Sequence, residues 1–94
     1  MTRSDILTIA KIDLEISGNS RDDYLNNLID LAESAITTEG INLIETTDDG
    51  MLIERYAVFL YRKRREDTMA MPRSLRYLLN NRLMHEKGSV KSGE

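Results

Sequence analysis

The chain has 94 residues, with 13 Lys and Arg against 16 Asp and Glu, and a formal net charge of −3 at pH 7. This length is typical of one domain with a small hydrophobic core. The sequence contains no cysteine, which excludes disulfides and thiolate metal sites. It also lacks the roughly 18–20 consecutive apolar residues of a membrane span and the apolar run of a signal peptide, so we expect a cytosolic protein with no membrane partner.

The charges are distributed unevenly along the chain. Acidic residues dominate residues 5–49, and basic residues dominate residues 55–82. Such polarity is typical of two surfaces with different partners. The alternative is that the charges only follow the preferences of helix ends.

Two patterns overlap near the start of the chain. Ser4 followed by Asp5 predicts a helix N-terminus, and the apolar residues between positions 6 and 10 have helical spacing. From Ile12 to Ile16, apolar and acidic residues alternate strictly, which is the period of a strand. We expect a short helix to about Lys11 and then an extended segment, with helix, strand and coil all open for residues 12–16.

The clearest amphipathic helix follows. Ser20 is its predicted N-cap, and Asp22 and Asp23 in the first turn complement the helix dipole. Gly40 is expected just after the helix in the left-handed conformation, with Ile41 packing back on the last turn. Apolar residues at intervals of three or four predict the buried face: Leu25, Leu28, Ile29, Ala32, Ala35 and Ile36.

A compact connector of residues 41–47 leads to a second long helix, expected from about Asp48 to Glu66 or Asp67. Thr46 or Thr47 is the predicted cap, and Thr46 with Asp49 has the spacing of a capping box. Residues 56–61 are apolar on every side, which predicts burial by helices all round or by a second subunit. A six-residue strand is the competing interpretation, which the caps disfavour. The predicted core residues here are Leu52, Tyr56, Phe59 and Leu60.

Pro72, the only proline, suits the first position of a last helix. This helix is expected to end near Glu86 and Lys87, with Gly88 as its stop. Residues 1–88 then form a single domain, and residues 89–94 form a flexible tail. The predicted core residues of this last helix are Leu75, Leu78, Leu79 and Leu83. The fold class is all-α: a small bundle of a short N-terminal helix, two long antiparallel helices and a C-terminal helix.

The sequence shows no convergent catalytic set. His85 is the only histidine and has no partner residues for a zinc site. No glycine-rich phosphate loop occurs, and Asp48 and Asp49 are too few for a calcium loop. We therefore expect no enzyme activity, no catalytic residues, no metal and no cofactor.

Four consecutive cations end the second long helix, and three readings of them stay open. They could bind nucleic acid, contact another subunit or partner, or be solvated charges at a helix end. Successive helical residues point about 100° apart, so the four side chains do not form one patch. The candidate partner contacts are Arg62, Lys63, Arg64, Arg65, Arg73, Arg76 and Arg82. The candidate complementary or channel-lining acids are Asp22, Asp23, Asp30 and Glu33.

Residues 56–62 (YAVFLYR) and 71–83 (MPRSLRYLLNNRL), with the helical layout of residues 3–88, resemble a known family. It is the family of small head–tail connector, or adaptor, proteins of tailed bacteriophages and prophages, also described as DNA-packaging proteins. Members have a short first helix, two long helices and a final helix that begins at a proline. The basic run of residues 62–65 is not a recognised motif of the family.

The resemblance implies a structural role. Such subunits form a ring under the portal protein, dodecameric in the particle, and dock a stopper or tail-completion protein. DNA passes through the channel without specific binding. The protein would act in the host cytoplasm during assembly and then at the head–tail junction of the virion. The alternatives are a nucleic-acid-binding helical domain that uses residues 62–65, or a helical regulator of one protein partner.

Overall fold

Four helices form the part of the chain that the structure describes. The structure is a computed structural model that describes the backbone of residues 1–92 and the side chains of residues 1–88. The helices are α1 (Arg3–Asp13), α2 (Asp22–Thr38), α3 (Thr47–Arg65) and α4 (Arg73–Ser92), and the described residues contain no strand. The predicted small all-α bundle is confirmed.

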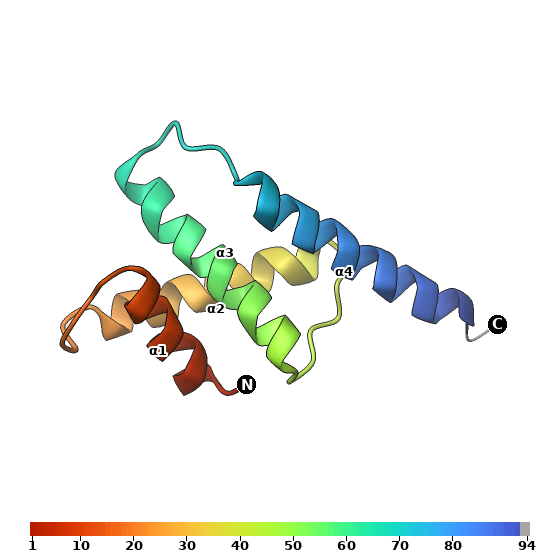
Figure 1. Cartoon of the computed structure of the whole chain (residues 1–94), viewed down its shortest axis with the longest axis horizontal. Coiled ribbons are helices and arrows are strands. Elements are labelled where there is room, and N and C mark those ends of the chain that lie inside the picture. Colours follow the sequence, from red (N-terminus) through yellow and green to blue (C-terminus); the bar gives the residue numbers. More distant parts are fainter. Residues whose placement is uncertain (93–94) are drawn as a thin grey trace.

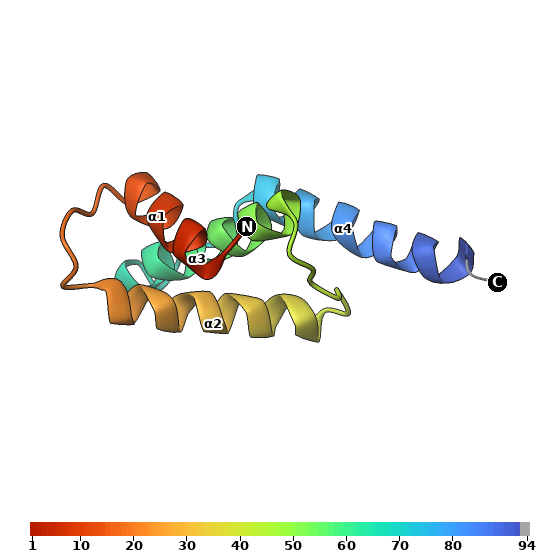
Figure 2. The ribbon, with the colours of Figure 1, turned by 90° about the horizontal axis from the view of Figure 1, so that it is seen from below.

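Helix α3 is the central element, because it packs against each of the other three helices. Helices α2 and α3 run in opposite directions along the long axis and cross each other (Figure 1). Helix α2 lies along one side of α3, and α1 covers the other side (Figure 2). Helix α4 contacts α3 with its first half and then extends past the bundle, so that the molecule measures 49 × 30 × 18 Å.

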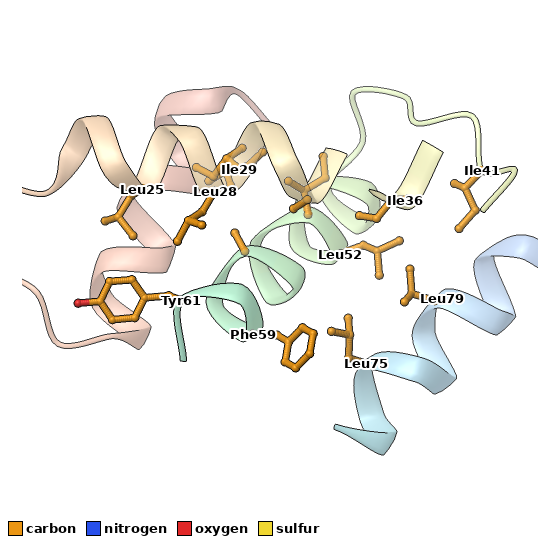
Figure 3. Packing of buried hydrophobic residues seen from close by; sticks show 14 residues of the cluster. Leu25, Leu28, Ile29, Ile36, Ile41, Leu52, Phe59, Tyr61, Leu75 and Leu79 are labelled. Atoms are coloured by element: carbon orange, nitrogen blue, oxygen red, sulfur yellow. The ribbon is translucent and has the colours of Figure 1, made fainter. Parts of the chain in front are cut away.

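The core forms between α2 and α3 and is completed by α1 and α4. Figure 3 shows Leu75 of α4 facing Phe59 of α3, with Leu79 lying towards Leu52. The predicted core residues that are buried are Leu25, Leu28, Ile29, Ala32, Ile36, Leu52, Phe59, Leu75 and Leu79. Three further ones, Tyr56, Leu60 and Leu83, are half-buried against this core.

The prediction for Leu78 is wrong, because its side chain is 36 % exposed. Leu75 and Leu79, four residues apart, define the face of α4 that meets α3. Leu78 lies on the flank of that face, where it lines a surface groove instead of the core.

The starts of the first two helices differ from the prediction. Thr2, not Ser4, caps α1 in a reciprocal capping box: the Asp5 amide donates to Thr2 Oγ1 at 3.1 Å, and the Thr2 amide donates to Asp5 Oδ2 at 3.0 Å. Arg21, not Ser20, occupies the cap position of α2, and its side chain makes no capping hydrogen bond. The N-terminus of α2 therefore depends on the acids of its first turn.

The prediction of an extended segment over residues 12–16 is wrong for residues 12 and 13. Helix α1 continues through Ile12, which is 69 % exposed, to Asp13. The chain then turns through Glu15 at φ 57°, and the Ile16 amide donates to the Lys11 carbonyl at 2.9 Å. Alternation alone does not make a strand where no neighbouring strand is present to pair with it.

Glycine ends one helix as predicted but not another. Gly40 has a φ of 104°, and Ile41 after it is 1 % exposed, so the predicted end of α2 is confirmed. Gly88 does not stop α4, which runs to Ser92, so the predicted end near residues 86–87 is wrong. Glycine inside a helix costs only about 1 kcal/mol relative to alanine and does not force an end. Of the predicted tail, residues 89–92 are helical and residues 93–94 lie outside the described residues.

Substitution by alanine should change the free energy of unfolding in opposite directions at Gly50 and at Gly88. A Cβ at Gly50 would lie 2.6 Å from both Cβ and Sδ of Met1, whereas a Cβ at Gly88 meets no atom of the described side chains within 4 Å. We expect Gly50→Ala to lower the free energy of unfolding by about 1–3 kcal/mol, because overpacking outweighs the gain in helix propensity. Gly88→Ala should raise it by up to about 1 kcal/mol. Urea unfolding followed by circular dichroism measures both, and a stabilised Gly50→Ala variant would contradict the close contact with Met1.

Candidate functional site

The basic run of residues 62–65 divides into two pairs. Arg62 Nη2 lies 3.5 Å from the Asp13 carbonyl, and Lys63 Nζ lies 5.8 Å from the centre of the Phe59 ring. Arg64 and Arg65 point instead towards the N-terminus of α2. As expected from the helical spacing, the four side chains of residues 62–65 point in different directions, and only two of them share any one surface.

Arg64 and Arg65 line a surface pocket of about 310 Å³ between the end of α3 and the start of α2. We name it the Arg–Tyr pocket, and its lining residues are Ser20, Arg21, Tyr24, Tyr61, Arg64 and Arg65. The two tyrosine rings lie 6.0 Å apart and form its floor. The Arg64 guanidinium is 6.0 Å from the Tyr24 ring centre, and the Arg65 guanidinium is 5.3 Å from the Tyr61 ring centre.

The hydroxyl group of Tyr61 organises the pocket. It accepts hydrogen bonds from Arg21 and, at 3.2 Å, from Arg65 Nη2. A phenolic oxygen that accepts two hydrogen bonds still has its own proton to donate. Two guanidinium groups and this O–H donor therefore surround the same point, an arrangement that suits a carboxylate or another anion.

No carboxylate of the described residues forms an ion pair with any arginine of the Arg–Tyr pocket. Asp22, in the adjacent turn, pairs with Lys11 at 2.8 Å. Glu66 and Asp67, which follow the basic run directly, also form no ion pair with it. The positive charge of the pocket is therefore not balanced within the described part of the chain.

The other predicted basic contacts are mostly used inside the fold. Arg76 forms two hydrogen bonds of 2.5 and 3.2 Å with Glu39 at the end of α2. Arg82 forms two of 2.8 and 3.2 Å with Asp49, which is 2 % exposed. Arg73 is exposed, and no described residue pairs with it. The sequence did not indicate these pairings, because each joins residues more than thirty positions apart.

The acids predicted to form a complementary or channel-lining face are mostly neutralised by α1. Arg3 Nη2 lies 2.6 Å from Asp30 Oδ1 and 2.6 Å from Glu33 Oε1. Lys11 pairs with Asp22, and only Asp23 is exposed without an ion-pair partner among the described residues. Arg3 and Lys11 therefore compensate part of the negative charge of these four acids, and Asp23 is the one without an ion-pair partner among the described residues.

A different acidic surface lies at the start of α3, formed by the end of the connector and the first turn of the helix. We name it the acidic ridge: Ile44, Glu45 and Asp48. Ile44 is 56 % exposed and borders two separate hollows, of about 350 and 720 Å³. Glu45 and Asp48 are exposed and have no ion-pair partner among the described residues. The ridge thus presents an apolar side chain flanked by two uncompensated carboxylates.

The backbone of this connector is held in place by the Asp49–Arg82 network. The Ile44 amide donates to Asp49 Oδ2 at 2.9 Å, and Arg82 Nη2 donates to the Asn42 carbonyl at 2.8 Å. The Asn42 amide donates to Glu86 Oε1 at 2.8 Å. Thr46 caps α3, because its Oγ1 accepts a hydrogen bond from the Asp49 amide at 3.2 Å. The predicted capping box is therefore half formed, because the Asp49 carboxylate bonds to Ile44 and Arg82.

Glu54 is a buried carboxyl group that the sequence reasoning missed. Its side chain is 0 % exposed, and neither carboxyl oxygen has a hydrogen-bond partner among the described residues. Burial, followed by the nearby carboxyl of Asp13, raises the pKa of Glu54 to about 8, although Arg55 and Arg62 oppose the shift. A signal was present, because Glu54 shares a helical stripe with the apolar positions 57, 58 and 61.

His85 is exposed and lines the larger hollow, between α3 and α4. This groove also contains the exposed Leu78. Within the described residues, no three His, Asp or Glu side chains are grouped so that they could hold a metal ion. None of the helices, as far as the described residues extend, has the length and apolarity needed to cross a membrane.

Comparisons with protein families, with curated proteins and with solved structures find no match to this chain.

Proposed function

We propose that this protein is a structural subunit of the head–tail connector of a tailed phage or prophage. In this role it forms a ring under the portal protein, extends the DNA channel and docks a stopper or tail-completion protein. The ring would be dodecameric in the particle. The protein would assemble in the host cytoplasm and reside at the head–tail junction. The chain would act through protein–protein contacts and catalyse no reaction.

One observation carries the proposal most directly: two uncompensated surfaces of opposite charge lie at opposite ends of α3. The acidic ridge lies at the start of α3, and the Arg–Tyr pocket lies around Arg65 at its end. A helix of 19 residues separates them by about 28 Å. Complementary surfaces at two different places on one subunit favour a heterologous contact, which closes into a ring when the rotation between subunits allows it.

The arrangement of the helices agrees with what the resemblance implies. A short α1, long α2 and α3, and an α4 directly after Pro72 follow one another in that order. The far half of α4 extends past the bundle, where it is accessible to a neighbour or to the portal (Figure 1). Asp22, Asp30 and Glu33 form ion pairs with α1, so these acids would present a reduced negative charge to a channel.

A nucleic-acid-binding domain is the second candidate, and the unpaired arginines of the Arg–Tyr pocket favour it. It predicts an affinity for duplex DNA that falls steeply as the salt concentration rises. Only Arg21, Arg64 and Arg65 converge there, and the chain as a whole carries a net charge of −3. A mobility-shift titration in low salt measures this affinity directly.

Negative-stain images of the purified chain, concentrated alone and mixed with the portal protein of its own phage, test the proposed function. The proposal predicts closed rings with a central channel and one copy number. Two-fold dimers under both conditions would contradict it, because an isologous contact is complete at two copies. Duplex binding without ring formation would favour the second candidate.

A further inference from the structure

We infer that the Arg–Tyr pocket is the docking site for the acidic ridge of a second copy of this chain. The inference rests on the proposed function, since it names the contact by which neighbouring subunits would meet. It does not depend on the number of copies in a ring.

The chemistry of the pocket defines what it accepts. Its floor is made of two tyrosine rings, and its rim carries Arg21, Arg64 and Arg65. Such a site suits an apolar side chain that has carboxylates on both sides. Guanidinium groups bind carboxylates in a planar, two-pronged geometry, and the Tyr61 hydroxyl proton is available as an additional donor.

The acidic ridge has the matching features. Ile44 is the apolar side chain, and it stands between two hollows, so it projects from the surface. Glu45 and Asp48 lie on the same short segment, and no described residue pairs with either. The Ile44 amide donates to Asp49, and Arg82 donates to the Asn42 carbonyl. These bonds hold the segment in place, so little conformational freedom is lost on docking.

The two surfaces cannot meet within one subunit. The acidic ridge and the Arg–Tyr pocket are at opposite ends of α3, about 28 Å apart. The ridge of one copy can only reach the pocket of another, and that second copy then presents its own ridge. The contact joins two different surfaces, so, where it is not reciprocated within one pair, it is head-to-tail and can be repeated.

Charge exchange between two variants tests this contact. We name Arg64→Glu/Arg65→Glu the pocket variant and Glu45→Lys/Asp48→Lys the ridge variant. Lys63→Glu/Arg73→Glu is the control, because it reverses two exposed cations outside the pocket. Circular dichroism spectra establish that all three are folded, and sedimentation velocity from 10 µM to 1 mM measures self-association.

We expect each of the first two variants to associate at least about tenfold more weakly than the unmodified chain, because like charges then face each other. An equimolar mixture of the two should regain association, since the native ridge of one meets the native pocket of the other and the second contact has exchanged charges. The control variant should behave as the unmodified chain does.

Three results would overturn the inference. If both variants associate as strongly as the unmodified chain, the subunits meet elsewhere, and the ring proposal stands without this contact. If the mixture does not regain association, the two surfaces are not partners. Duplex binding that the pocket variant alone loses, with its self-association unchanged, assigns the pocket to nucleic acid and also overturns the inference.

Discussion

Replacing Arg82 by methionine is expected to lower the free energy of unfolding by roughly 3–5 kcal/mol, which is the usual cost of leaving a buried charge unpaired. Asp49 is 2 % exposed, and Arg82 supplies two of its hydrogen bonds, at 2.8 and 3.2 Å. Without Arg82, only the Ile44 amide would remain as a hydrogen-bond partner of the Asp49 carboxylate. Since small domains have a total stability of about 5 kcal/mol, much of this variant should be unfolded. Urea unfolding at pH 7 measures the change.

A second substitution separates charge burial from lost packing. In Arg82→Met/Asp49→Asn the buried group is neutral, and its amide oxygen can still accept from Ile44, so the double variant should be more stable than Arg82→Met alone. Arg73→Met removes an exposed arginine and should change stability by less than about 0.5 kcal/mol. A loss below about 1 kcal/mol in Arg82→Met would mean that the network does not hold the connector.

Replacing Glu54 by glutamine is expected to stabilise the protein, and the gain should grow with pH. The pKa of Glu54 is about 8 in the folded chain against an ordinary value of 4.5, so unfolding releases a proton between these pH values. Stability therefore falls by about 1.4 kcal/mol per pH unit from about pH 4.5 to pH 8, which amounts to roughly 3 kcal/mol at pH 7. The glutamine side chain of Glu54→Gln does not titrate, so at pH 7 this variant should be more stable than the unmodified chain by about that amount. Below pH 4.5 the two should be equally stable.

Unfolding free energies measured at several pH values between 4 and 8 give the comparison. Glu45→Gln is the matched control, because Glu45 is exposed and its removal should leave the pH dependence unchanged. Asp13→Asn should narrow the pH range over which stability falls, since the carboxyl of Asp13 contributes to the raised pKa of Glu54. Parallel stability curves for the unmodified chain and Glu54→Gln would show that Glu54 is not buried as a neutral acid.

Asp49 has the opposite pH dependence. Burial alone would raise its pKa, but the hydrogen bonds from Arg82 and from the Ile44 amide, with the charge of Arg82, hold it below 3.8. Its contribution to stability is present above pH 3.8 and is lost as the pH falls through the lowered pKa. On the contributions of Asp49 and Glu54 together, the protein should be most stable near pH 4–5.

Periodicity predicted α2 because its burial repeats at the helical spacing, whereas the middle of α3, apolar on every side, was predicted from its caps. The buried side chains from Leu25 to Ile36 are one face of α2, and the positive φ of Gly40 ends it. Periodicity failed at Ile12, where a strand pattern lies within the last turn of a helix. The predicted end of α4 at Gly88 failed for another reason, because glycine was given more weight than the helix that surrounds it.

The candidate site could be predicted only in part from the sequence. Arg64 and Arg65 were identified by their charge, but their convergence with Tyr24 and Arg21 joins segments about forty positions apart. The same limit applies to Arg76 and Arg82, which looked free in the sequence but have carboxylate partners on other elements. A residue's charge is visible in the sequence, whereas the compensation of that charge depends on the tertiary fold.

Engineered cysteines measure the head-to-tail contact most directly, because the chain has none of its own. Positions 45 and 64 of one chain are too far apart for a disulfide, which needs Cα atoms within about 7 Å. Under mild oxidation, Glu45→Cys/Arg64→Cys should therefore give a ladder of reducible multimers, and a mixture of the two single variants should give a mixed dimer. Only symmetric 45–45 or 64–64 dimers, or no crosslinked product, would contradict the contact between the acidic ridge and the Arg–Tyr pocket.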